Sequence, residues 1–245
     1  MPSDGRPSVG AAIPAYNAER WLAQAIESLL AQSAVPGDIL VLDDGSTDAT
    51  ATVAGRFGSP VRVLSQANAG IGAARNRAVE LVRGEIVAFL DADDLYTPSS
   101  IATRLDVLLE RPHVGAVFGH ERRFAEIRDG KPVPIGPSRP SPLPGSMLVR
   151  RDALELVGRF PADTRVAEGL DWLLRAQELS VESVTVEEQV LWRRVHGENN
   201  SVRHRDSMGE FARTLKASLD RRRARASVGA EANVPIESRR REVGP

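Results

Sequence analysis

Short apolar runs alternate with amphipathic stretches through the first half of the chain. The apolar runs predict buried strands at 9–13, 38–42, 61–64 and 85–90. Between and after them, apolar residues recur every three or four positions, which predicts helices at 17–32, 49–56, 72–82 and 98–109. Strands and helices that alternate with short connections are typical of a mostly parallel sheet with helices on both faces.

The second half of the chain is less regular. Its apolar pattern predicts strands at 114–118, 122–127, 181–186 and 190–195, and helices at 152–157 and 167–179. The segment from Lys131 to Gly145 contains six prolines and is predicted to be a loop, after a hairpin turn at Asp129-Gly130. A basic helix is predicted at 205–225, followed by a disordered tail at 226–245.

Composition narrows the classes of protein that fit this pattern. The 245 residues are 42% apolar and 27% charged, with a net charge of −1, which argues against a general nucleic-acid binder. The chain has no cysteine, so disulfides and thiolate metal sites are excluded. No apolar run is long enough to cross a bilayer, and the N-terminus lacks the apolar core of a signal peptide. We therefore expect a cytoplasmic protein.

Polar clusters follow three of the predicted strands, each at the strand's carboxyl end. They are Pro14-Ala15-Tyr16-Asn17, Asp43-Asp44-Gly45-Ser46 and Asp91-Ala92-Asp93-Asp94. Open α/β sheets bind their ligands beyond the carboxyl ends of the strands. The clusters therefore predict one ligand site at this edge of the sheet.

The acidic cluster after the fourth strand suits a divalent cation. Asp91 and Asp93 are separated by one residue, so that both carboxylates can point to one side of a turn. Carboxylate oxygens are preferred by Mg²⁺ and Mn²⁺. By themselves, these residues are equally compatible with a polar strand-to-helix loop that has Asp94 near the helix start.

Two further segments are less specific, the acidic cluster after the second strand and a glycine-rich segment at 70–72. A carboxylate at a strand end, here Asp43 or Asp44, can accept hydrogen bonds from a ribose hydroxyl or a base N–H. Asp48 is also expected to cap the following helix. The Gly70-Ile71-Gly72 segment permits close backbone approach, and Arg75 extends from the helix that follows it.

The ordered set of segments resembles the family 2 glycosyltransferases of the GT-A fold. The resemblance is carried by IPAYNAERWLAQAIESLLAQS, ILVLDDGSTDAT, NAGIGAARNRAVE and GEIVAFLDADD, and more loosely by PGSMLVRRDALELVGRFP, AEGLDWLLR and WRRVHGENNS. It implies a single GT-A domain at 8–204, with a Rossmann-like, mostly parallel sheet and a small antiparallel acceptor-side portion. The nucleotide-sugar-binding half would be 8–97, and the acceptor-side half 98–204.

The resemblance also implies an activity and roles for individual residues. The activity would be transfer of a sugar, with inversion, from a nucleotide-diphosphate sugar (a UDP-sugar is favoured) to an acceptor, assisted by Mn²⁺ or Mg²⁺. For the nucleotide, the resemblance implies a frame formed by Pro14, Ala15, Tyr16 and Asn17, and contacts to the base from Asp43 or Asp44 and from Arg75. Asp91 and Ala92 would lie at the ribose or at a metal-bound water. Asp93 and His196 would hold the metal, and Arg193 and Arg194 would contact the phosphates.

The acceptor side departs from the family pattern. Family members have Glu-Asp-x-Asp at the start of a helix, with the first Asp as catalytic base, whereas this chain has Glu168-Gly169-Leu170-Asp171. Asp171 is favoured over Glu168 as the substitute base. Each also has a structural alternative, since Asp171 can pair with Arg175 one turn on and Glu168 can favour the helix N-terminus. Gly145, Ser146 and Trp172 are expected on the acceptor side.

Two interpretations of function remain open. The first is an active, metal-dependent transferase; the alternative is a degenerate nucleotide-sugar-binding protein that acts as sensor or scaffold. Gly169 favours the alternative, and the intact Asp91-x-Asp93 favours the enzyme. Nucleotidyl transfer ranks low because the N-terminus lacks a basic, glycine-rich loop. The acceptor (small molecule, peptide or glycan), a homodimer, and docking of the basic helix on an acidic partner or lipid surface are left open.

Overall fold

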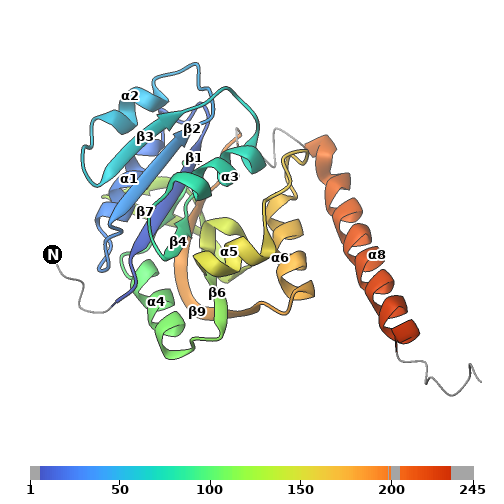
Figure 1. Cartoon of the computed structure of the whole chain (residues 1–245). Helices are drawn as coiled ribbons and strands as arrows, with labels where there is room; N and C mark the ends of the chain where they lie inside the picture. The colour runs from blue at the N-terminus through green and yellow to red at the C-terminus, as the bar shows by residue number, and fades with distance from the viewer. Residues whose placement is uncertain (1–5, 198, 200–204, 233–245) are drawn as a thin grey trace, which may run out of the picture.

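One mixed sheet organises the chain, and helices cover both of its faces (Figure 1). The computed structural model describes residues 6–197, 199 and 205–232. The strands are β1 (Val9–Ala15), β2 (Asp38–Asp43), β3 (Val61–Ser65), β4 (Ile86–Phe89), β5 (Leu95–Tyr96), β6 (Val114–Arg128), β7 (Lys131–Ser141), β8 (Leu148–Arg150) and β9 (Glu182–Arg194). The helices are α1 (Leu22–Leu30), α2 (Thr50–Gly55), α3 (Ile71–Leu81), α4 (Ser100–Glu110), α5 (Arg151–Val157), α6 (Glu168–Glu178) and α8 (Gly209–Ala232), with short 3-10 turns η1 (Pro144–Ser146) and η2 (Arg205–Met208).

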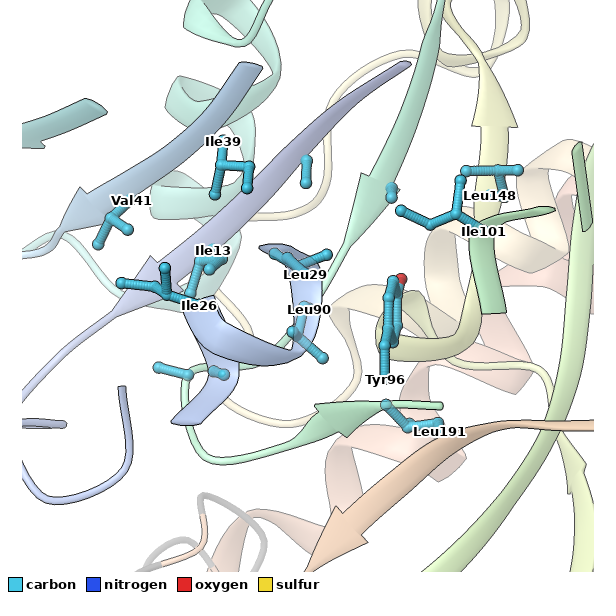
Figure 2. Close-up of a cluster of buried hydrophobic side chains, with 14 of the residues drawn as sticks. Ile13, Ile26, Leu29, Ile39, Val41, Leu90, Tyr96, Ile101, Leu148 and Leu191 are labelled. Carbon is cyan, nitrogen blue, oxygen red and sulfur yellow. The ribbon is translucent and has the colours of Figure 1, made fainter. Parts of the chain in front are cut away.

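The N-terminal half of the sheet is parallel, as the alternating pattern predicts. The strand order is β3-β2-β1-β4-β8-β6-β9-β5, with β7 paired to β6, and the first four strands in this order are all parallel. Successive side chains of a strand point to opposite faces, so Ile13 packs in one core and Ala12 in the other. Helices α1 and α4 cover the first core, part of which Figure 2 shows, and α3, α5 and α6 cover the second.

The C-terminal half supplies the antiparallel portion, although its elements differ from those predicted. Residues 131–141 form strand β7 rather than a loop, because β7 lies at the sheet edge, where prolines need not donate to a second neighbour. The predicted pairs of strands are the continuous β6 and β9, which run parallel to each other through register shifts. The hairpin turn is confirmed, with positive φ at Asp129 (50°) and Gly130 (73°).

The basic helix extends beyond its predicted end. After η2, α8 continues to Ala232, so that part of the predicted tail is helical. The rest of that tail, 233–245, lies outside the described residues, as do 198 and 200–204 of the predicted domain. Among the residues that the structure describes, no helix combines the length and apolar character needed to cross a membrane.

A partly buried ion pair holds the start of β2. The Asp38 carboxylate accepts hydrogen bonds from Arg62 Nε (2.6 Å), Arg62 Nη2 (2.8 Å) and the Arg83 backbone N–H (2.7 Å). Burial disfavours the charged carboxylate, but these donors outweigh it and lower the pKa of Asp38. A depressed pKa stabilises the fold above the unfolded-state pKa of about 3.9, and this contribution is lost as pH falls through the folded-state pKa.

We therefore expect Asp38→Asn to lower the free energy of unfolding at pH 7 by about 1–2 kcal/mol, because the Arg62 guanidinium and the Arg83 N–H lose a charged acceptor in a largely buried position. The difference from the native chain should shrink as pH falls below about 4. Urea denaturation at pH 7 and pH 3 measures both effects. Asp129→Asn, in the exposed hairpin turn, is the control. Equal destabilisation by Asp38→Asn at the two pH values would contradict this account.

Candidate active site

A cavity of about 840 Å³ opens at the carboxyl ends of β1, β2 and β4. Its walls come from these strand ends, the start of α3, the loop before α6, the first turn of α6, the end of β9 and the start of α8. Predicted site residues that line it are Pro14, Ala15, Tyr16, Asn17, Asp44, Arg75, Asp91, Ala92, Asp93, Glu168, Arg193 and His196. The structure thus brings together side chains that are more than 180 residues apart in the chain.

The two acids after β2 have different surroundings. Asp43 accepts hydrogen bonds from the Ser46 backbone N–H (3.0 Å) and the Ser65 hydroxyl (3.1 Å), and it is absent from the cavity lining. Asp44 lines the cavity and accepts the backbone N–H groups of Ala69 (3.0 Å) and Gly70 (2.9 Å). Asp43 therefore shapes its own turn, whereas Asp44 ties the loop before α3 to the cavity wall.

Asp93 meets His196 at the cavity wall. Asp93 Oδ2 lies 2.9 Å from His196 Nε2 and accepts a hydrogen bond from Asn199 Nδ2 (3.0 Å). Asp91 lies two residues away, with 39% of its side chain exposed. Within residues 6–197, 199 and 205–232, no group of three or more His, Cys, Asp or Glu side chains is arranged to hold a metal ion. Two protein ligands with open positions still suit a cation that is also bound by diphosphate oxygens.

Asp94 is buried beneath this pair. Burial, and next the neighbouring charges of Asp93 and Asp91, raise the pKa of Asp94 well above its ordinary value. Its carboxylate accepts the Arg194 backbone N–H (2.7 Å). Three carboxyl groups thus crowd one turn, and a bound cation would relieve the repulsion between their charges.

The two arginines at the end of β9 diverge. Arg193 lines the cavity, and its Nη1 lies 3.7 Å from Glu121 Oε1. Arg194, predicted to contact phosphates, is 2% exposed and absent from the cavity lining. Its guanidinium packs against the rings of Trp21 (4.3 Å) and Phe124 (4.4 Å), and Nε donates to the Asp93 carbonyl (2.8 Å). Arg194 therefore holds the acidic turn at 91–94 through its backbone and does not enter the cavity.

Arg75 joins the acidic turn to α6. It is 3% exposed, and its Nη2 donates to Asp91 Oδ1 (2.8 Å), while its Nε lies 3.5 Å from Glu168 Oε1. Burial is the main cause that raises the pKa of Glu168, and the charge of Arg75 opposes it. Among the described residues, buried Glu168 Oε2 and Arg75 Nη1 have no hydrogen-bond partner. Glu168 therefore lines the cavity with one buried carboxylate oxygen that no described residue occupies.

Asp171, favoured by the sequence over Glu168, lies elsewhere. Its carboxylate accepts a hydrogen bond from Arg175 Nε (2.7 Å) and lies 3.7 Å from Arg221 Nη1 on α8. It is absent from the cavity lining, and both of its oxygens are directed at the arginines of α6 and α8 instead. Of the two candidates for the base, Glu168 lines the cavity and Asp171 does not.

The glycine in this motif is explained by packing. A Cβ on Gly169 would lie 2.5 Å from Pro144 Cδ and 2.7 Å from Pro144 Cγ. Residue 169 lines the cavity, but η1 occupies the space that any side chain would need.

The remaining acceptor-side candidates are buried supports. The Ser146 hydroxyl donates to the Ser141 carbonyl, and Arg104 Nη1 donates to the Ser146 carbonyl (2.6 Å). Trp172 is 1% exposed and stacks on Phe160 at 5.9 Å. Gly145 is buried and absent from the cavity lining, although a Cβ there would come within 3.7 Å of Asp91.

Comparison with known families agrees with this geometry. Residues 11–161 match the model of glycosyl transferase family 2. The chain belongs to this family. The chain is similar to the chondroitin synthase of Escherichia coli. The two are 30% identical over 230 residues, which cover 88% of this chain and 33% of the synthase. The E. coli K12 protein named uncharacterized glycosyltransferase YibD is 41% identical over 101 residues, 40% of this chain and 29% of YibD. The chain spans about a third of the length of these relatives.

Solved structures confirm the GT-A fold of the family 2 chain. Staphylococcus aureus TarS in complex with UDP-GlcNAc matches with a TM-score of 0.66 at 20% identity, over 86% of this chain and 65% of that one. The mannosyltransferase PcManGT from Pyrobaculum calidifontis, in complex with GDP-Man and Mn²⁺, matches with a TM-score of 0.67 at 20% identity, over 87% of this chain and 65% of that one. At this identity the likeness concerns the fold.

Some residues of the family 2 cavity were not predicted from the sequence. They are Asn199, the loop 162–166 before α6, Leu143 with the first residue of η1, Pro144, and Phe211 of α8. Asn199 lies in the segment that carries the resemblance, next to His196, and could have been included. The loop and Phe211 carry no sequence signal, since they reach the cavity only through the packing of α6 and α8.

Proposed function

We propose that the chain transfers a sugar, with inversion, from a nucleotide-diphosphate sugar to an acceptor. The observation that carries this proposal is the convergence of Asp91, Asp93, His196 and Glu168 on one cavity at the strand ends. A UDP-sugar is favoured as donor, in line with the ligand of TarS, and the GDP-Man bound to PcManGT keeps a guanosine donor as the second candidate. The acceptor is a small molecule, peptide or glycan.

Asp93 and His196 would hold a Mn²⁺ or Mg²⁺ ion, with Asp91 beside them. Such an ion supplies positive charge that stabilises the departing diphosphate. Arg193, which also lines the cavity, would add a cation for the phosphate oxygens. Arg194 keeps the acidic turn in place through the Asp93 carbonyl.

Glu168 is the proposed base. An inverting transfer needs a carboxylate that takes the proton of the acceptor hydroxyl while its oxygen bonds to the anomeric carbon and the sugar–phosphate bond breaks. Glu168 meets this need because it lines the cavity, has an unpartnered oxygen among the described residues and has a raised pKa. Arg75, held by Asp91, keeps the carboxylate in place and stabilises its charged form.

A thermal-shift panel tests donor and cation together. We expect UDP and UDP-sugars to raise the melting temperature, more so with Mn²⁺ than without it. At a concentration 100 times the Kd, binding stabilises by about 2.7 kcal/mol, which corresponds to a shift of roughly 5–10 °C for a chain of this size. Asp93→Ala should retain a smaller shift and lose its dependence on Mn²⁺.

Asp106→Ala is the matched control, because this exposed acid on α4 lies outside the cavity. It should behave as the native chain. Absence of a shift with every uridine and guanosine donor would refute the proposed function, and an unchanged Mn²⁺ dependence in Asp93→Ala would refute the assignment of the metal ligand.

A further inference from the structure

The C-terminal helix α8 lies along α6 (Figure 1). The Glu178 carboxylate at the end of α6 accepts hydrogen bonds from Ser218 Oγ (2.6 Å) and Arg221 Nε (2.8 Å). Arg225 Nη1 donates to the Glu178 carbonyl (2.6 Å). These donors lower the pKa of Glu178, Arg221 first, so the carboxylate remains charged and bound. Part of the positive charge of the basic helix is thus paired with the end of α6.

With α8 held along α6 by these contacts, the first turn of α8 lies at the cavity. Glu210 is 8% exposed, and its Oε2 accepts the backbone N–H groups of Arg165 (2.8 Å) and Val166 (3.1 Å). Both residues belong to the loop 162–166, which lines the cavity, as does the neighbouring Phe211. One carboxylate oxygen therefore holds two consecutive amides of a cavity wall.

The other end of this loop is held by α3. The Asn76 side chain accepts the Phe160 N–H and donates to the Phe160 carbonyl, both at 2.8 Å. The close approach of Gly72 to Pro161 leaves no room for a side chain, since a Cβ would lie 2.0 Å from the Pro161 carbonyl oxygen. The loop is therefore held by α3 at its beginning and leads into the first turn of α6, which contains Glu168. Glu210 of α8 holds the loop just before that turn.

We propose that Glu210 is a positioning residue that holds the 162–166 loop as a wall of the cavity and makes α8 part of the catalytic unit. The inference rests on the proposed function for its kinetic consequence. Charge-assisted hydrogen bonds to two backbone amides restrict the loop next to Glu168. Displacement of such a wall by an ångström can reduce the rate of a reaction that depends on orientation. Asp44 and Asp93, which are expected to contact the nucleotide and the metal, are held by partners outside this loop.

The test compares Glu210→Ala, Glu210→Gln and Asp220→Ala in the full chain. Asp220 is an exposed acid on the same helix, outside the cavity, and serves as the control. Hydrogen exchange at residues 165 and 166 is expected to be about tenfold faster or more in Glu210→Ala, intermediate in Glu210→Gln and unchanged in Asp220→Ala. Exchange in the core strand β1 reports whether the variants are folded.

Kinetics separates positioning from a merely structural role. With the UDP-sugar that gives the largest thermal shift, kcat of UDP release should fall about tenfold in Glu210→Ala, with KM for the donor within about threefold, and Glu210→Gln should recover part of the rate. Faster loop exchange with native kcat, or unchanged exchange, would overturn the proposal. A native chain that turns over no donor would refute the proposed function instead; the exchange comparison would then still decide whether Glu210 holds the loop.

Discussion

Glu168→Gln is expected to reduce UDP release by at least about 100-fold, because the amide cannot take the acceptor proton and general base catalysis contributes about 10²–10⁴. Gln has nearly the same shape as Glu, so nucleotide binding should persist, as measured by the thermal shift with UDP and Mn²⁺. The rate is measured with the donor that gives the largest shift. Loss of rate with binding retained is the pattern expected for a base.

Asp171→Asn is the matched control. Asp171 is paired with Arg175 and Arg221 outside the cavity, so this variant should keep its rate within about threefold of the native chain. A large loss in Asp171→Asn with a native rate in Glu168→Gln would restore the assignment that the sequence favours. If the native chain binds UDP but turns over no donor, the sensor or scaffold interpretation gains support.

The pH profile provides a second readout for the same residue. Burial raises the pKa of Glu168, against the opposing charge of Arg75 and with a smaller contribution from Asp91 in the same direction as burial. The base must be deprotonated, so kcat/KM should fall as pH drops through this raised pKa, at a higher pH than an ordinary glutamate near 4.3 would produce. In Glu168→Gln, the residual rate should lack this acid limb.

Gly169→Asp is expected to damage the fold rather than to restore a base. The substitution recreates the family's Glu-Asp pair, but its Cβ would lie 2.5 Å from Pro144 Cδ. Overpacking costs about 1–3 kcal/mol, and an added buried charge increases the loss, so we expect a decrease of about 3 kcal/mol in the free energy of unfolding. Urea denaturation measures this, and UDP release should not rise.

Two further variants isolate the cause. Gly169→Ala adds only the Cβ and should account for the steric part of the loss. Pro144→Ala removes the Cγ and Cδ atoms that this Cβ would meet, so combining it with Gly169→Ala should recover stability, with a coupling energy of about 1 kcal/mol or more in a double-mutant cycle. Native stability in Gly169→Asp, or additive losses in the double variant, would disprove the role of Pro144.

Local patterns predicted the parallel half of the fold well. Strands β1, β2 and β4 are continuous apolar runs, and α1 and α4 show their apolar stripes at helical spacing, so one short window contains the evidence for each element. Strand β7 was missed because four prolines between 131 and 141 resemble a loop in any local window. They are compatible with a strand only at a sheet edge, and edge position is a property of the assembled sheet.

The candidate site divides in the same way. Asp91, Asp93 and Asp44 follow predicted strands, and strand ends of a parallel sheet meet at one edge, so their presence at the cavity follows from sequence order alone. Arg194 is the last residue of β9, and whether its side chain enters the cavity or packs between Trp21 and Phe124 depends on partners more than 60 residues away. The sequence predicted the same role for Arg193 and Arg194, whereas only Arg193 lines the cavity.

The sequence by itself determined the fold class, the family and the acidic cluster, because each depends on short segments whose spacing is set by the chain. Only the tertiary structure placed Glu168 at the cavity and Asp171 outside it, explained Gly169 through Pro144, and brought Glu210 to the loop 162–166. These three results depend on contacts that α6 and the loop before it make with elements distant in sequence. Such contacts are decided by packing, where differences of tenths of an ångström determine which side chain fits and which faces the ligand.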